Sequence, residues 1–182
     1  MLSDPAYPNI HQKLITKCRK GDRKAQFEIY RLYYKSMYNT SLRIVKDPQE
    51  AEDIMQESFL SAFRKIETYE GKVSFGAWLK KIVINNSLDV IKKRRLLFEE
   101  LSEDYAQLAM QEEALDEELL VQQTDLIREA IQKLPDGYRV ILSLHLLEGY
   151  DHEEIAEILN ISSSTSRSQF FRAKQKLLRL LK

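Results

Sequence analysis

Apolar residues recur at every third or fourth position along most of this chain, and that spacing is typical of amphipathic helices. Only 5 Gly and 4 Pro interrupt the 182 residues, so the chain has few strong turn signals. No stretch of the first half alternates polar and apolar residues as a half-buried strand does. The sequence therefore predicts an all-α fold made of two small helical domains.

The first domain is predicted over residues 9–95, after a loose tail at residues 1–8. Helical spacing runs from about residue 12 to residue 45, with a break at Gly21 and Asp22. The expected inner face of this segment comprises Phe27, Tyr30, Tyr34, Met37, Tyr38, Ser41 and Val45. We therefore expect two helices before residue 46.

The next helix has a clear start, because Asp47, Pro48 and Glu50 have the pattern of a capping box. Its expected buried stripe is Ala51, Ile54, Met55, Ser58, Phe59, Ala62, Phe63 and Ile66. Residues 69–72 are predicted to be a loop, followed by a helix from about Phe75 to Arg95. The expected inner face of that last helix is Phe75, Trp78, Leu79, Ile82 and Asn86.

Charge divides the chain into three parts, although the formal net charge is zero. Residues 1–95 carry 19 Lys and Arg against 11 Asp and Glu, whereas residues 96–125 carry ten acidic residues and no basic ones. Residues 126–182 carry nine basic residues against seven acidic ones. This asymmetry indicates nucleic acid or another charged partner, or simply two domains joined by a solvated acidic linker, which we place at residues 96–123.

The second domain, residues 124–182, contains the pattern of a helix-turn-helix. Asp151 and Glu154 form a capping box, Asn160 suits the left-handed turn that ends a helix, and Ser162 caps the helix that follows. The first helix is expected to bury Ile155, Ala156 and Leu159, with Ile161 in the core. The second is expected to bury Ser166, Phe170, Ala173, Leu177 and Leu180.

The opposite face of the second helix suits duplex DNA. Arginine pairs with guanine edges, glutamine pairs with adenine, and hydroxyls and N-terminal amides suit phosphate oxygens. The candidate residues for this contact are Ser164, Thr165, Arg167, Ser168, Phe171, Arg172 and Gln175. Lys174, Lys176 and Arg179 add attraction to the backbone. A plain helical hairpin with a solvated basic face is the alternative.

Two motifs in the right order resemble the extracytoplasmic-function (ECF) group of the sigma-70 family. AEDIMQESFLSAF at residues 51–63, followed by Phe75, Trp78, Leu79, Ile82 and Asn85, resembles sigma region two. Leu134, Pro135, Tyr138 and Arg139, followed by EGYDHEEIAEILNIS, resemble region four. The resemblance implies a non-enzymatic initiation factor that binds core RNA polymerase and promoter DNA, without a cofactor of its own.

The resemblance also implies roles for residues of the first domain. The clamp helices of the largest catalytic subunit would contact Asp53, Gln56, Glu57 and Leu60, although an ordinary solvated acidic face is commoner for such a stripe. The minus-10 strand would contact Tyr69, Lys81, Asn85, Lys92 and Arg95, and the duplex candidates above would read the minus-35 element. An anti-sigma factor is expected as a further partner. The acidic linker would be a spacer or would thread toward the polymerase cleft.

Two departures from the family pattern are Ser166, where an apolar residue is frequent, and Asn160, where Gly is frequent. One branch of the family combines them with a histidine such as His152, which we expect to pack or cap rather than bind a metal. The alternative function is a helix-turn-helix regulator that binds duplex DNA without polymerase.

Several classes of protein are disfavoured by composition. An enzyme lacks support, because the sequence offers no phosphate loop, metal cluster or activated nucleophile. One cysteine, Cys18, and three scattered histidines do not suit a disulfide framework or a zinc site. We expect no secretory signal and no membrane insertion, hence a cytoplasmic protein.

Overall fold

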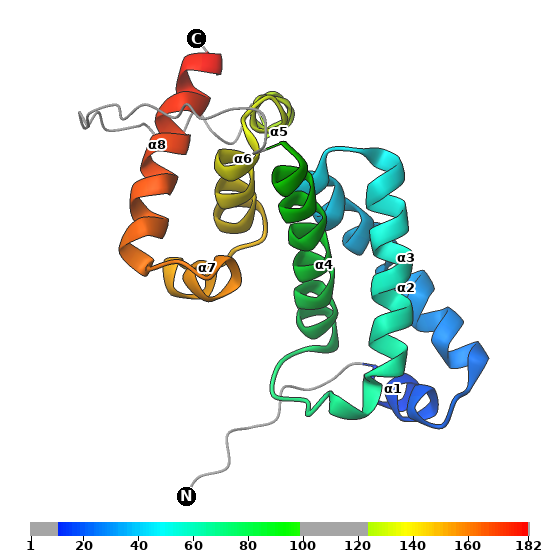
Figure 1. The fold of residues 1–182 in the computed structure, drawn as a ribbon. Coiled ribbons are helices and arrows are strands. Elements are labelled where there is room, and N and C mark those ends of the chain that lie inside the picture. The colour runs from blue at the N-terminus through cyan, green and yellow to red at the C-terminus, as the bar shows by residue number, and fades with distance from the viewer. Residues whose placement is uncertain (1–10, 99–123, 182) are drawn as a thin grey trace, which may run out of the picture. The chain divides into compact units, whose positions relative to one another are not determined.

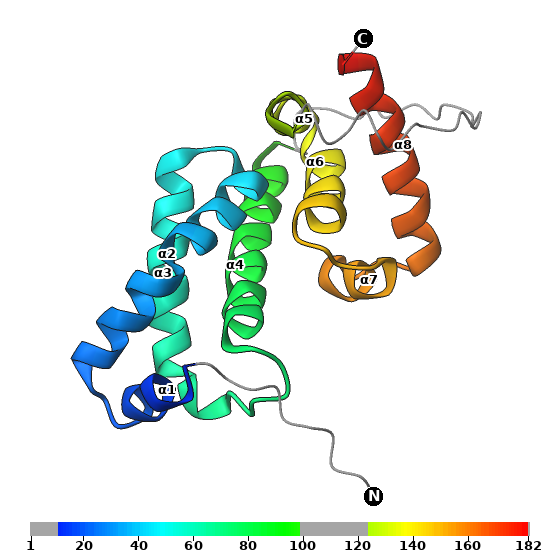
Figure 2. The same ribbon diagram turned by 180° about the vertical axis from the view of Figure 1, so that it is seen from behind.

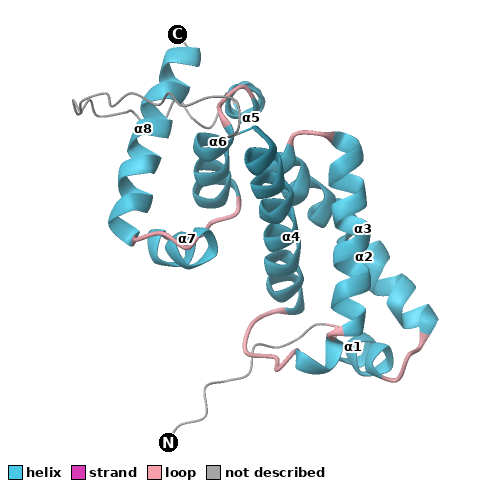
Figure 3. Cartoon of the chain, viewed as in Figure 1, coloured by secondary structure: helices cyan, strands magenta, loops and turns pink. Residues whose placement is uncertain are grey.

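The computed structural model describes residues 11–98 and 124–181, and within them every regular element is helical (Figure 3). This confirms the predicted all-α class. The chain divides into two compact units, Met1–Val90 and Ile91–Lys182, which we describe separately. The predicted tail and most of the predicted linker lie outside the described residues.

The first unit is a helical bundle (Figure 1). Helices α2 and α3 lie side by side, and α1 packs against α2. The elements are α1 (Gln12–Arg19), α2 (Arg23–Val45), α3 (Pro48–Arg64), the 3-10 turn η1 (Ile66–Thr68) and α4 (Phe75–Phe98). The break at Gly21 and the start of α4 agree with the sequence prediction, whereas α4 extends to Phe98 and so includes the first three residues of the predicted linker.

The core of the first unit is rich in aromatic side chains. Phe75 is 1% exposed, and its ring lies 5.4 Å from the rings of both Tyr69 and Trp78. Tyr30 joins α2 to α3, since its ring lies 4.9 Å from that of Phe59. Aromatic pairs at these separations add to the stabilisation from buried area alone.

Two polar bridges also hold the helices of the first unit together. Asn86 of α4 donates from Nδ2 to Oγ of Ser58 on α3, at 2.9 Å. Ser87 of α4 lies with its Oγ 3.1 Å from Oγ of Ser41 on α2. Asn86 was expected on the inner face, and the structure confirms this by giving it a partner there.

Phe27 corrects the predicted inner face of α2, because its side chain is 62% exposed. The buried positions of this part of α2 are Ala25 and Ile29, each two residues away from Phe27. Two residues correspond to about 200° around a helix axis, so Phe27 points away from the core. Tyr30 and Tyr34 lie between these extremes and are half-buried.

In the second unit, helices α6 and α8 pack against each other and α7 packs against α8 at one end (Figures 1 and 2). The elements are α5 (Thr124–Gln132), α6 (Asp136–Leu142), the π-helical turn η3 (Ser143–Leu147), α7 (His152–Leu159) and α8 (Ser163–Leu181). Helix α6 begins at Asp136, two residues before the predicted Tyr138, because Pro135 serves as its N-cap. The predicted break at Gly149 is present, and its φ of 80° suits glycine.

Burial in the second unit differs from the prediction at five positions. Leu180 is 46% exposed, beyond the last buried turn of α8 at Leu177. Ala156, Leu159, Ile161 and Phe170 are half-buried, and Ile155 is the buried residue of α7. Helix α7 has only 8 residues, so its side chains at the rim of the contact with α8 keep part of their exposure.

Candidate DNA-binding and polymerase-binding surfaces

The turn between α7 and α8 is built by the predicted caps. The Asp151 carboxylate accepts from the amides of Glu153 and Glu154, and the Glu154 side chain accepts from the Asp151 amide, which completes the capping box. Asn160 ends α7 with φ 55° and ψ 51°, the left-handed conformation. Ser162 then accepts from the Thr165 amide at 3.0 Å and so caps α8. These contacts confirm the predicted helix-turn-helix.

The N-terminal turn of α8 carries a cluster of hydroxyls. Oγ of Ser162 lies 2.8 Å from Oγ of Ser164 and 2.7 Å from Oγ1 of Thr165. Two of the predicted DNA-contacting residues are therefore held by the capping residue. The amides of the first turn and these hydroxyls present donors where a phosphate oxygen could bind.

The outer face of α8 has no acidic residue. Ser164, Arg167, Ser168 and Arg172 are exposed, so the structure brings these four predicted residues to one accessible surface. Thr165, Phe171 and Gln175 are half-buried. Phe171 is predicted on the DNA-facing side, and its half-burial leaves only part of the side chain open to a base.

The basic residues in the last turns of α8 have different surroundings. Lys176 lies with Nζ 5.9 Å from the centre of the Tyr138 ring, in a cation–π contact. Arg179 is exposed in the last turn of the helix. Tyr138 belongs to the Leu-Pro-x-x-Tyr-Arg motif, so one part of this motif supports the basic face of α8.

An ion pair between a buried arginine and a half-buried aspartate in that motif was not anticipated from the sequence. Arg139 is 1% exposed, and its Nη2 lies 2.9 Å from Oδ1 of Asp136, while Nη1 donates to the Leu134 carbonyl at 3.2 Å. These contacts fix the turn between α5 and α6. The spacing of Asp136 and Arg139, i and i+3 on a helix, was the available signal.

The predicted polymerase-binding stripe lies on the accessible face of α3. Asp53, Gln56, Glu57 and Leu60 are all exposed, and the Leu60 side chain is 52% exposed. Gln56 donates to the Glu52 carboxylate at 3.2 Å, and Glu57 lies 3.6 Å from Arg64. An exposed ion pair of this kind contributes little to stability, so both groups are available to a partner.

Tyr69 lies in the core and is not open to solvent. It is 3% exposed, its ring packs against Phe75 and Trp78, and its hydroxyl donates to the Val73 carbonyl at 2.7 Å. The ring therefore closes the loop that precedes α4 and does not present a face to a base in this conformation. Periodicity could not reveal this burial, because Tyr69 lies in a loop.

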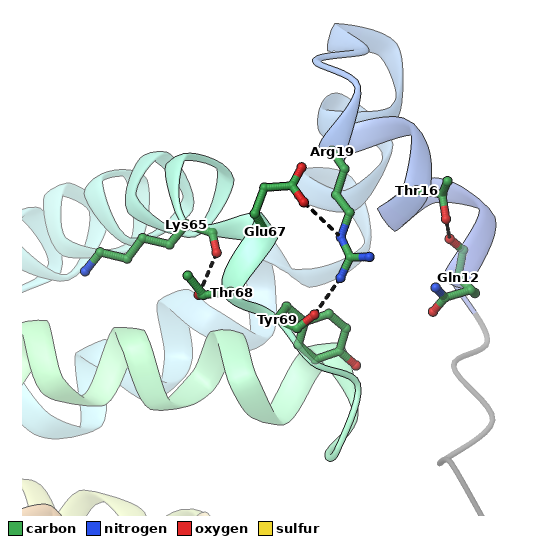
Figure 4. A network of polar contacts seen from close by, with 7 residues as sticks. All are labelled: Gln12, Thr16, Arg19, Lys65, Glu67, Thr68 and Tyr69. Atoms are coloured by element: carbon green, nitrogen blue, oxygen red, sulfur yellow. Dashed lines mark hydrogen bonds and ion pairs between the residues drawn. The ribbon is translucent and has the colours of Figure 1, made fainter.

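The same residue is tied to α1 by the network in Figure 4. Arg19 donates from Nη2 to the Tyr69 carbonyl at 2.5 Å, and its Nε lies 4.0 Å from the Glu67 carboxylate. Thr68 donates to the Lys65 carbonyl at 2.7 Å. The start of the loop is thus fixed on both sides, by α1 and by the core.

The remaining minus-10 candidates lie on α4. Lys81, Asn85 and Lys92 are exposed, and Asn85 is adjacent in sequence to the half-buried Asn86. Arg95 lies within α4, and its side chain is outside the described part of the structure. The exposed candidates follow one another at spacings of four and seven residues, which places them along one side of the helix.

The lone cysteine is a core residue. Cys18 is 3% exposed, and burial, with a smaller effect of Asp22, raises the pKa of its thiol to about 11. Such a thiol is neutral at pH 7 and is a poor nucleophile. Within residues 11–98 and 124–181, no three His, Cys, Asp or Glu side chains are grouped as metal ligands. None of the described helices has the length and hydropathy needed to cross a bilayer.

A helical bundle followed by a helix-turn-helix, whose second helix α8 has no acidic residue, is typical of DNA-binding proteins. Comparison with known proteins identifies which one. Residues 29–96 match the family Sigma-70 region 2, and residues 124–177 match Sigma-70, region 4.

The chain is 30% identical over 181 residues to the ECF RNA polymerase sigma factor SigW of Bacillus subtilis, covering 94% of this chain and 96% of that protein. It is 29% identical over 173 residues to the RNA polymerase sigma-H factor of Pseudomonas aeruginosa, covering 90% of each. The fold is similar to that of sigma factor RpoE of Bartonella quintana in complex with the anti-sigma factor NepR, with a TM-score of 0.57, 23% identity, and coverage of 85% of this chain and 94% of that one.

The chain belongs to the ECF sigma factors of the sigma-70 family. This confirms the resemblance and favours a sigma factor over a regulator that acts without polymerase. Members of this family are transcription initiation factors and not enzymes.

Proposed function

We propose that this protein recruits core RNA polymerase through α3, reads minus-35 duplex DNA with α8, and holds the minus-10 strand beside α4. The acid-free exposed face of α8 within a capped helix-turn-helix is the observation that carries the DNA-binding part. The protein would act in the cytoplasm, where its polymerase and promoters are found. It needs no cofactor of its own, because the polymerase supplies the chemistry of RNA synthesis.

The minus-35 element is read by the outer face of α8. Arg167 and Arg172 are five residues apart and both exposed, so either guanidinium can reach a guanine edge in the major groove. Ser164, Thr165 and Ser168 position the helix on phosphates, and Phe171 and Gln175 complete the surface at its edge. Arginine supplies base discrimination here, while the hydroxyls supply orientation.

The minus-10 strand is held by α4 and the loop before it. Lys81, Lys92 and Arg95 attract the phosphates, and the exposed Asn85 amide offers both a donor and an acceptor to an unstacked base. Tyr69 contributes by closing the loop through its bond to the Val73 carbonyl. Its role in this proposal is to shape the site and not to stack on the base.

Polymerase binding is assigned to the α3 stripe, with Leu60 as its apolar centre. A partner would bury the exposed Leu60, and Asp53, Gln56 and Glu57 would form a polar rim around it, as in other protein interfaces. The expected partner surface is the pair of clamp helices in the largest catalytic subunit.

Replacing Leu60 tests this assignment directly. We expect Leu60→Ala to weaken binding to core polymerase by about 10-fold or more, as truncation of a central interface residue does. Leu32→Ala is the matched control, because Leu32 is 48% exposed on α2, against 52% for Leu60. Equal affinities of both variants for the core, measured by fluorescence anisotropy, would contradict the assignment of α3.

An anti-sigma factor is proposed as the protein that keeps this sigma factor inactive. The related RpoE of Bartonella quintana was captured with the anti-sigma factor NepR, and the CnrH structure, with a TM-score of 0.57 and 20% identity, holds the cytosolic domain of CnrY. Affinity purification of the tagged full chain, followed by competition with core polymerase, tests this partner. A bound protein that core polymerase displaces is the expected result.

A further inference from the structure

Two histidines and one phenylalanine form a ring stack inside the helix-turn-helix. The rings of His145 and His152 are stacked, with centres 4.7 Å apart and planes inclined by 11°. Phe170 of α8 meets them edge-on, at 4.5 Å from His145 and 5.4 Å from His152. One ring comes from η3, one from the first residue of α7 and one from α8, so the stack joins three elements.

Each imidazole has a fixed hydrogen-bond partner. Nδ1 of His145 lies 2.8 Å from the Tyr150 carbonyl, which only accepts, so this nitrogen carries a proton in either charge state. Nδ1 of His152 lies 2.9 Å from the Ser166 hydroxyl. Ser166 is fully buried, whereas a family member would often carry an apolar residue at this position. The His152–Ser166 bond therefore connects the start of α7 to α8.

The surroundings of His152 favour the neutral ring. Burial comes first, followed by His145 from η3 and Arg167 from α8, and together they lower the pKa of His152 below its ordinary value near 6.5. Asp151, which caps α7, opposes this shift only in part. Glu148 and Glu154 lie close to Tyr150, whose carbonyl faces Nδ1 of His145. A positive charge on His152 would lie close to Arg167 and against the ring of His145.

We propose that His152 is a positioning residue that docks α8 on α7 through Ser166 best as the neutral imidazole, so that the placement of α8 depends on pH. A neutral ring can accept the Ser166 hydroxyl proton at Nδ1, whereas a protonated ring would have to donate there to the hydroxyl oxygen, with its positive charge close to Arg167. Because the folded chain resists protonation and the unfolded chain does not, stability is lost as pH falls from about 6.5. Above that pH both states are neutral, and the docking is at full strength.

Amide hydrogen exchange of the full chain tests the docking without DNA. We expect the protection factors of residues 166–170, corrected for intrinsic exchange, to fall about five-fold or more between pH 7.5 and pH 5.5. His11→Gln is the matched control, because His11 lies in the first unit against Tyr33, and it should leave this fall unchanged. A protection factor that does not change with pH in the wild-type chain would overturn the proposal.

Paired substitutions separate positioning from simple packing. His152→Leu combined with Ser166→Ala replaces both polar partners by apolar groups, so no buried group is left without a partner. We expect this double variant to keep the protection measured at pH 7.5 and to lose the pH dependence. Ser166→Ala alone should lower protection at pH 7.5, because it removes the partner of Nδ1 in His152. A double variant whose protection still falls at pH 5.5 would show that other groups are responsible.

The consequence for promoter binding rests on the proposed reading role of α8. Holoenzyme containing either the wild-type chain or the double variant would be titrated with a duplex promoter fragment at pH 7.5 and pH 5.5. A steeper loss of affinity for the wild-type holoenzyme supports the proposal, and equal losses contradict it. If neither holoenzyme binds the fragment at either pH, the proposed function fails, and the exchange experiment still decides the docking.

Discussion

The two units of this sigma factor are held together by different kinds of interior. The first is filled by aromatic and aliphatic side chains, with Phe75 in contact with the rings of Tyr33, Tyr69 and Trp78. The second has an aliphatic core and buries the charged side chain of Arg139, whereas buried hydroxyl side chains occur in both units. A buried ring stabilises in proportion to the volume that it fills, whereas a buried charged side chain depends on its partners being present. Substitutions in the two interiors should therefore destabilise the two units for different reasons.

The largest effect is expected from the aromatic core. Phe75→Ala should destabilise the first unit by about 4 kcal/mol, because it removes a fully buried ring and leaves a cavity. Denaturant unfolding followed by amide exchange in α1 and α4 would measure the loss. Phe27→Ala is the control, since Phe27 is 62% exposed and its removal should change stability by less than about 0.5 kcal/mol.

A comparable loss in the second unit should come from a single charged residue. Arg139→Met keeps much of the side-chain volume but removes the ion pair with Asp136 and the bond to the Leu134 carbonyl. We expect destabilisation by about 3 kcal/mol, measured by exchange of amides in α5 and α6. Arg179→Met, on an exposed arginine of α8, is the matched control. If Arg139→Met is neutral, the second unit is held by apolar packing alone, and the contrast between the units disappears.

Substitutions on the exposed face of α8 should change the affinity for duplex DNA and leave the stability of the second unit unchanged. Arg172→Ala is expected to weaken minus-35 duplex binding by about 1–3 kcal/mol and to relax sequence preference at one position. Arg179→Ala should weaken binding equally on all sequences and lower the salt dependence. Anisotropy titrations on matched and mismatched duplexes would distinguish the two. Equal loss on every sequence for Arg172→Ala would assign that arginine to phosphate contact.

The smallest expected difference lies between two neighbouring asparagines of α4. Asn86→Ala should destabilise the first unit by about 1 kcal/mol, because Ser58 loses its donor. Asn85→Ala should leave stability and core binding intact and reduce promoter opening, since Asn85 is exposed. Permanganate footprinting of the minus-10 region would measure opening. Loss of core affinity in Asn85→Ala would contradict its placement beside the DNA strand.

Much of this architecture could be predicted from the sequence, because caps and breaks are local. Asp47, Asp151, Asn160 and Ser162 have the expected capping or turn geometry, and the helix bounds follow from them. Burial was harder to predict, because it depends on which other side chains a residue packs against. Phe27 belongs to an aromatic series along α2 yet faces solvent, and Tyr69 belongs to a loop yet lies in the core.

The exposure of the candidate site residues was predicted where helical spacing sets it and missed where long-range partners set it. The exposed residues of α3 and α8 lie on the expected faces, since helical spacing alone sets the face. The stack of His145 with His152 could not be anticipated, because the π-helical turn η3 and the bend at Gly149 bring the two rings together. Neither feature has a signal in the spacing of apolar residues.

Run-off transcription tests the central claim most directly. Core RNA polymerase from the same organism would be supplied with genomic fragments in the presence and absence of this protein. We expect promoter-specific transcripts only when the protein is present, with start sites that reveal paired minus-35 and minus-10 elements. The absence of such transcripts, together with protection of duplex sites by the protein without polymerase, would contradict the account and favour a conventional regulator.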